Sequence, residues 1–180
     1  MNHAIADFTK AVELNPKDVL AYSNRGSAYS VKGQFDQAID DYTKAIELNP
    51  KYAIAYNDRG SAYASKGFLE NAITDFDKSI ELNPLDSTTY SNRGNAFKDK
   101  GQLDKAITDY TKAIELNPKD GTPYYGIACI HSLNKNVEES CKWLQKSVRN
   151  GFNDWEYLKR DVNLNNIRDT SCYKKIIVGK

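Results

Sequence analysis

Glu-Leu-Asn-Pro at residues 47–50 decides the fold, because the same four residues recur along the chain at a fixed distance. A strict period of a few tens of residues is typical of a solenoid, in which each unit cannot bury its apolar face alone and stacks on its neighbours. Such arrays present extended surfaces to other proteins, so the period also indicates a class of function. The four copies end at Pro16, Pro50, Pro84 and Pro118, and each proline follows the last by 34 residues.

The composition of the 180 residues argues against several kinds of partner. The chain has 25 lysines and arginines against 24 aspartates and glutamates, a net charge of +1, whereas nucleic acids and anionic membranes attract a basic surface. No apolar run approaches the roughly 20 residues that a membrane-spanning helix needs. The N-terminus lacks the basic region and apolar stretch of a secretory signal. We therefore expect a cytoplasmic protein that binds neither nucleic acid nor membrane.

Three full repeats follow one another when Val19 is taken as the first position of the first repeat. They span residues 19–52, 53–86 and 87–120. Aromatic residues recur at the fourth, eleventh and twenty-fourth positions, glycine at the eighth and alanine at the twentieth. In the first repeat these are Tyr22, Tyr29, Tyr42, Gly26 and Ala38.

The spacing within each repeat predicts a pair of helices. Tyr22, Gly26 and Tyr29 are four and three residues apart and therefore share one face of a first helix. Gly33 lies where a helix end favours a left-handed residue, and Pro50 stops the second helix. The small residues at the eighth and twentieth positions would let the two helix backbones approach closely.

Together, these recurring residues resemble the tetratricopeptide repeat, over nearly the whole chain. The resemblance implies an all-α fold: antiparallel helix pairs stacked into a right-handed superhelical solenoid. It also implies that the first helix of every pair lines a concave groove.

Both ends depart from the pattern. Residues 1–18 match only the second half of a repeat, so the chain is either a fragment of a longer array or packs the uncovered face on something else. Residues 121–152 form a degenerate fourth repeat. Residues 153–180 resemble the closing segment of many bacterial proteins of this family, and we expect short helices at 153–159 and 170–177 that cap the last apolar edge.

Two positions change together in the fourth repeat. The seventh position is arginine and the twenty-third is aspartate in each full repeat, as in Arg59 and Asp75, but Ile127 and Trp143 stand there in the fourth. A buried arginine needs such a partner, which predicts that the two residues meet between the helices of one repeat. The alternative is that the repeats share an ancestor and the last one drifted independently.

The residues that could carry chemistry form no recognisable site. The three cysteines, Cys129, Cys141 and Cys172, are expected to be reduced thiols that pack between helices, and their spacing with His131 matches no zinc pattern. Catalysis by a cysteine and a histidine would also need a third residue that orients the histidine, and the sequence shows no recognisable candidate. The sequence therefore predicts no enzyme activity, no metal and no cofactor.

The resemblance also implies which residues face the groove. In this family the fifth, sixth and ninth positions do so, and here they are small, polar and mostly uncharged. Asparagine side chains both donate and accept hydrogen bonds and could hold an extended peptide backbone, although the same residues would suit a solvated helix face. The candidate peptide-binding residues are Ser23, Asn24, Ser27, Asn57, Asp58, Ser61, Ser91, Asn92, Asn95 and, as an aromatic contact, Tyr125.

The leading hypothesis is an adaptor or scaffold that binds a peptide segment of another protein in this groove. The alternative is self-assembly, in which the N-terminal helix of residues 1–18 is covered by a second copy of the chain. An enzyme or metalloprotein ranks third, because it demands a site that the sequence does not show. Nothing in the sequence identifies the partner.

Overall fold

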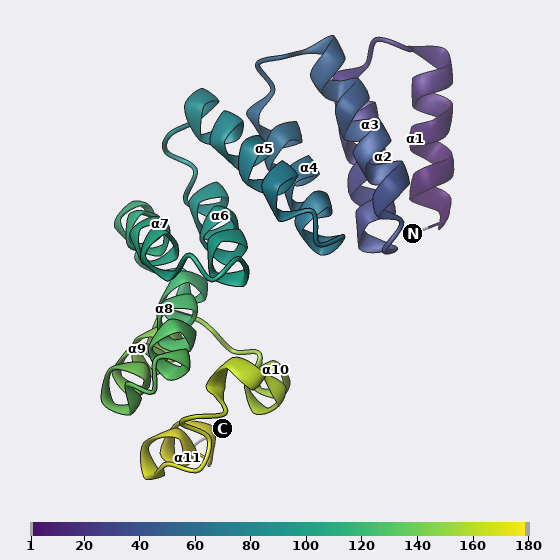
Figure 1. The fold of residues 1–180 in the computed structure, drawn as a ribbon. Coiled ribbons are helices and arrows are strands. Elements are labelled where there is room, and N and C mark those ends of the chain that lie inside the picture. The colour runs from purple at the N-terminus through teal and green to yellow at the C-terminus, as the bar shows by residue number, and fades with distance from the viewer. Residues whose placement is uncertain (1, 179–180) are drawn as a thin grey trace. The chain divides into compact units, whose positions relative to one another are not determined.

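The computed structural model describes residues 2–178, which form α-helices and one short 3-10 helix and contain no strand. The chain divides into two compact units, with the boundary between Ala96 and Phe97. Each predicted full repeat, as well as the fourth, contains two helices joined by a short turn (Figure 1).

The first unit consists of antiparallel helices that pack in chain order (Figure 1). Each of α1 to α4 packs against the helix that follows it. The helices are α1 (Asn2–Leu14), α2 (Val19–Val31), α3 (Phe35–Leu48), α4 (Ala53–Ser65), α5 (Leu69–Leu82) and α6 (Ser87–Asp99), the last of which runs across the unit boundary.

The turns between paired helices depend on glycine. Gly33 and Gly67 have φ angles of 73° and 81°, in the left-handed region that residues with a Cβ rarely adopt. The second helix of the first repeat ends when the backbone of Asn49 becomes extended, and Pro50 follows it. The sequence prediction of two helices separated by glycine and closed by proline is confirmed in both repeats of this unit.

Small residues let aromatic rings approach the helix backbone in the first unit. A Cβ added to Gly60 would lie 2.8 Å from Cε1 of Phe76, and one added to Gly26 would lie 2.8 Å from Cε1 of Tyr42. Ala38 and Ala62 are fully buried beside Tyr42. Glycine at the eighth position thus makes room for the aromatic ring of the twenty-fourth.

The second unit ends in a segment that folds back on the fourth repeat. Its apolar cluster joins Leu144 of the fourth repeat to Leu158, Leu164, Ile167 and Tyr173. The two closing α-helices begin and end within two residues of the expected ranges. The elements are α7 (Leu103–Leu116), α8 (Gly121–Leu133), α9 (Val137–Arg149), α10 (Trp155–Arg160), the 3-10 helix η1 (Val162–Leu164) and α11 (Ser171–Val178).

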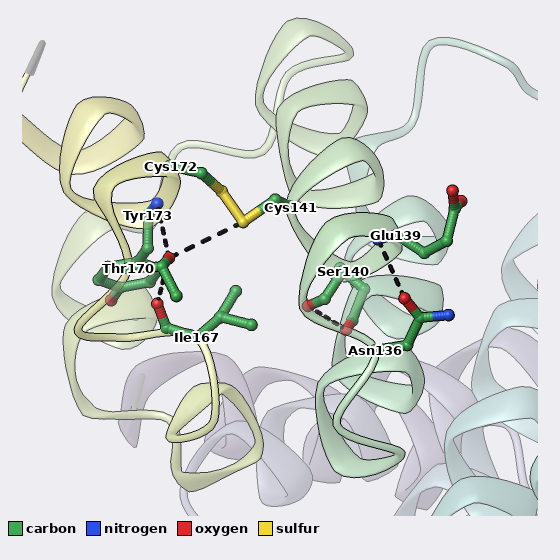
Figure 2. The surroundings of a disulfide bond; sticks show 9 residues. Asn136, Glu139, Ser140, Cys141, Ile167, Thr170, Cys172 and Tyr173 are labelled. Atoms are coloured by element: carbon green, nitrogen blue, oxygen red, sulfur yellow. Dashed lines mark hydrogen bonds between the residues drawn. A yellow bond between two sulfur atoms is a disulfide. The ribbon is translucent and has the colours of Figure 1, made fainter.

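A disulfide between Cys141 and Cys172 joins α9 to α11 (Figure 2). The two Cα atoms are 6.3 Å apart, within the range that disulfides span. The prediction that all three cysteines are reduced thiols is therefore wrong for this pair, and Cys129 alone is a free, buried thiol. The spacing of 31 residues gave no hint of the bond, because the folded-back segment brings the two residues together.

Within residues 2–178, no helix is long and apolar enough to cross a membrane. The same residues contain no group of three histidine, cysteine, aspartate or glutamate side chains placed to hold a metal ion.

Candidate functional site

The predicted pairing of arginine with aspartate is present in the first two repeats. Nε and Nη2 of Arg59 each lie 2.8 Å from a carboxylate oxygen of Asp75, and Arg25 makes the same two-pronged contact with Asp41 at 2.8 and 2.7 Å. Hydrogen bonding to Asp75 raises the pKa of Arg59. Both aspartates are buried, so these pairs fix the first helix of a repeat on the second.

The remaining nitrogen of each guanidinium reaches the preceding repeat, a contact that sequence reasoning missed. Nη1 of Arg59 donates to Oγ1 of Thr43 at 2.9 Å, and Nη1 of Arg93 donates to Oδ1 of Asp77 at 2.6 Å. The sequence contains a pattern that could have predicted this contact. The twenty-fifth position is threonine or aspartate in every repeat that precedes such an arginine. Arg59 therefore links three helices and holds the first two repeats in register.

The fourth repeat replaces this pair with an apolar contact, as the paired substitution predicted. Ile127 is buried in a cluster with Tyr110, and Trp143 packs against the same cluster. The two halves of the substitution therefore meet in one apolar environment.

A pocket of about 210 Å³ opens in the first unit between α2, α3 and α4. Three of its lining residues, Ser27, Asp58 and Ser61, are candidate peptide-binding residues at the sixth and ninth positions. The pocket is completed by Ser30, Val31 and Tyr42. The pocket therefore lies between the first and second repeats, and three of its six lining residues occupy predicted groove positions.

Three hydroxyl groups around this pocket donate their hydrogens to other atoms of the protein. Ser27 Oγ donates to the carbonyl oxygen of Ser23 at 3.1 Å, and Ser61 Oγ donates to that of Asn57 at 3.0 Å. The hydroxyl of Tyr42 donates to Ser27 Oγ at 3.2 Å. Three oxygen atoms therefore keep lone pairs but no spare hydrogen.

Asp58 carries the charge of the pocket. Its Oδ1 accepts a hydrogen bond from Asn57 Nδ2 at 3.1 Å. Burial raises the pKa of Asp58, and the neighbouring carboxylate of Asp86 raises it further, although the bond from Asn57 acts in the opposite direction. Burial also raises the pKa of Tyr42, to about 12, so its phenol is neutral at pH 7. The pocket therefore contains one acidic side chain, next to which no cation of the described residues lies.

The asparagine side chains of the groove bond largely to one another. Asn92 Nδ2 donates to Asn57 Oδ1 at 3.0 Å and lies 3.4 Å from Ser61 Oγ, while Thr89 Oγ1 donates to Asn57 Oδ1 at 3.2 Å. These bonds join α4 to α6. Asn24 is exposed on α2, and Asn95 is half-buried on α6. Asn57 and Asn92 thus form a bonded bridge between α4 and α6, whereas Ser27, Asp58 and Ser61 line the open pocket.

Three of the predicted contact residues have buried side chains. Ser23 and Ser91 at the fifth position are 3% and 4% exposed, since a short side chain there lies below the helix surface. Tyr125 is 7% exposed. Its ring stacks on Phe152 at 4.5 Å between centroids, and its hydroxyl donates to Asp161, so the folded-back segment covers it.

Comparison with known proteins agrees with this geometry. A family model described as the tetratricopeptide repeat matches residues 19–52 and 87–120, and one described as the TPR repeat matches residues 60–101. Together the two models cover more than half of the chain. No curated protein matches the chain.

Solved structures share the same fold. The crystal structure of MamA is 26% identical with a TM-score of 0.73, and the match covers 81% of this chain and 85% of MamA. YrrB, a TPR protein with an unusual peptide-binding site, is 23% identical with a TM-score of 0.68 over 93% of this chain and 84% of its own. TTC0263, a thermophilic TPR protein of Thermus thermophilus, is 20% identical with a TM-score of 0.73 over 84% of each chain. The repeated helix pairs, the matched family models and these structures lead to one conclusion: the chain belongs to the tetratricopeptide repeat family.

Proposed function

We propose that this protein is a non-enzymatic scaffold that binds a peptide segment of a partner protein along the groove positions of the first unit. The observation that carries the proposal is the pocket between α2, α3 and α4, because its walls are residues that the repeat places on the groove face. Binding sites are concave and combine apolar surface with a few converging polar groups, and this pocket does both.

The exposed groove residues suit an extended peptide. Asn24 offers an amide donor and an acceptor on the surface of α2, and Ser27, Asp58 and Ser61 follow along the pocket. The bonded bridge from Asn57 to Asn92 holds the next helix in place, so the peptide would meet a preorganised surface. The likeness to YrrB supports the fold, and the peptide-binding proposal depends on the residues of this chain.

A displayed library of random decapeptides tests this proposal. The bait is the wild-type protein, and Asn24→Arg introduces a bulky charge at an exposed candidate groove position of α2. Gln37→Arg is the matched control, because it makes the same charge change at an exposed position of α3, outside the pocket lining. We expect wild type and the control to enrich a shared peptide motif that Asn24→Arg retains poorly. Equal retention by all three folded proteins would place binding elsewhere.

Self-assembly is the second candidate, and an observation on α1 favours it. Leu14 is 75% exposed, and Asp7 is exposed although the equivalent Asp41 and Asp75 are buried against arginines. A second copy of the chain that covers α1 would bury the leucine and offer Asp7 a partner. Sedimentation equilibrium over a hundredfold concentration range decides this: a rising mass supports self-assembly, and a constant monomer mass excludes it.

A further inference from the structure

We propose that the pocket between α2, α3 and α4 receives the cationic end of a lysine or arginine side chain of the bound peptide. The inference rests on the proposed groove binding and specifies its chemistry. It is carried by the arrangement of hydrogen-bond acceptors around Asp58.

The size of the pocket fits a single side chain. Sites for small molecules and cofactors usually have volumes of about 300–1,000 Å³. The volume of about 210 Å³ is below that range. The pocket is also open on the surface of α2, where Val31 is 70% exposed. An aliphatic stem that enters along Val31 would place its polar end among the oxygens.

The hydrogen bonds around the pocket select a donor rather than an acceptor. The hydroxyl hydrogens of Ser27, Ser61 and Tyr42 are used in the bonds described above, so these groups present only lone pairs. Asp58 adds a carboxylate, which in its ionised form has acceptors and no donor. Ser30 also lines the pocket, and its side chain hydrogen-bonds to Tyr42. An ammonium or guanidinium group carries several N–H donors and matches this set, whereas a ligand carboxylate would meet lone pairs.

The electrostatics point the same way. No lysine or arginine among residues 2–178 forms an ion pair with Asp58, and the charged neighbour that acts on it is another carboxylate, Asp86. Burial without a cation raises the pKa of Asp58, and an incoming cation would reverse that effect. Within the described residues, Asp58 is thus an acidic side chain in the pocket wall without a cation beside it.

The three full repeats differ at the position of this acidic residue. The sixth position is asparagine in the first and third repeats, at Asn24 and Asn92, and aspartate only in the second. A peptide lying along the groove would therefore meet one anionic pocket between uncharged amides. The expected motif has one basic residue at a defined position rather than a run of basic residues.

Selection from the random decapeptide library tests the inference with a substitution that the chain already tolerates at this position. Asp58→Asn gives the second repeat the residue of the first and third, and Asp40→Asn removes the same charge from an exposed position of α3. We expect wild type and Asp40→Asn to enrich peptides with one fixed lysine or arginine. We expect Asp58→Asn to lose that preference and to bind a selected peptide at least about tenfold more weakly.

The other outcomes separate this inference from the proposed function. A motif without a basic residue, or one that Asp58→Asn retains, would overturn the cation pocket and leave groove binding intact. If the folded wild type enriches no peptide, the proposed function fails.

A probe that needs no peptide then tests the pocket itself. n-Butylammonium has the four-carbon chain and the ammonium group of a lysine side chain, and 1-butanol is its uncharged counterpart. We expect n-butylammonium, at constant ionic strength, to produce saturable shifts of the backbone amide resonances of Ser27, Asp58 and Ser61. 1-Butanol and the Asp58→Asn variant should give none. Equal shifts with both probes, or no shifts with n-butylammonium, would contradict the proposal that the pocket binds a cation.

Discussion

In the second repeat, the seventh and twenty-third positions hold Arg59 and Asp75, which meet as a buried ion pair. In the fourth repeat, the same positions hold Ile127 and Trp143, which meet in an apolar cluster. Both pairs fasten the first helix of a repeat to the second, and both reach the repeat before it: Arg59 bonds to Thr43, and Ile127 packs in one cluster with Tyr110. The two positions must therefore be substituted together, because replacing the arginine or the aspartate alone would leave the other residue buried without its partner.

A second pair of positions changes in the same coordinated way. The eighth and twenty-fourth positions are Gly60 and Phe76 in the second repeat, where the ring packs against the helix backbone. In the fourth repeat they are Ala128 and Leu144, both fully buried in one cluster. A larger residue on one helix is matched by a smaller one on the other, so the space between the helices is filled in both regions.

The largest effect is expected from the disulfide, which only the second unit contains. The bond between Cys141 and Cys172 closes a loop of 31 residues, and such loops stabilise a fold by about 3–4 kcal/mol. Reduction with a dithiol should lower the urea midpoint of the second unit. Both tryptophans of the chain, Trp143 and Trp155, lie in this unit, so their fluorescence reports on it alone.

The control for this experiment is the Cys172→Ser variant, which should resemble the reduced protein and should not respond to the dithiol. An unchanged midpoint after reduction of the wild type would mean that packing alone holds α11.

The next largest effect comes from breaking the ion pair of the second repeat. Arg59→Ile leaves the carboxylate of Asp75 buried without a partner and should cost about 3 kcal/mol of unfolding free energy. Adding Asp75→Leu gives this repeat an apolar pair like that of the fourth and should recover most of the loss. Urea unfolding followed by far-ultraviolet circular dichroism measures both steps. If the two losses simply add, the residues are not coupled.

A smaller effect is expected at the eighth position. Gly60→Ala places a Cβ 2.8 Å from the buried ring of Phe76 and 3.1 Å from the carbonyl oxygen of Ala72. Overpacking should outweigh the better helix propensity of alanine, with a net cost of about 1–2 kcal/mol. Ser65→Ala, at an exposed position of the same helix, is the control. In the double variant with Phe76→Leu the cost should be less than the sum of the single costs, and strict additivity would argue against the shared space.

The smallest effect concerns the turn of the fourth repeat. Gly33, Gly67 and Gly101 have positive φ angles, and Lys135 takes the same place in the fourth repeat with a φ of 58°. Lys135→Gly should therefore stabilise the second unit by about 1 kcal/mol, because the left-handed conformation strains a residue with a Cβ. Tryptophan fluorescence during urea unfolding provides the readout, and a loss of stability would show that the lysine side chain is needed there.

Sequence reasoning was reliable wherever a residue type repeats with the helix pairs. The turns at glycine, the ends at proline, the ring beside Gly60 and the Arg59–Asp75 pair all follow from periodicity and from the need to satisfy a buried charge. It failed where the fold depends on contacts beyond the period. The position of Tyr125 indicates a groove residue, but Phe152 and Asp161 cover it. The disulfide and the Asn57–Asn92 bond likewise depend on side-chain positions that no spacing reveals.

The arginines of the first unit also bear on how its repeats come apart. Because Arg59 bonds to Thr43 of the preceding repeat as well as to Asp75, melting of that repeat would strip a partner from a guanidinium that stays folded. Arg93 reaches the preceding repeat through an ion pair with Asp77, whose side chain is 57% exposed, so salt should weaken the coupling between these two repeats. At high ionic strength the first helices should then melt more independently of the repeats that follow, so that unfolding changes from one cooperative block toward separate steps.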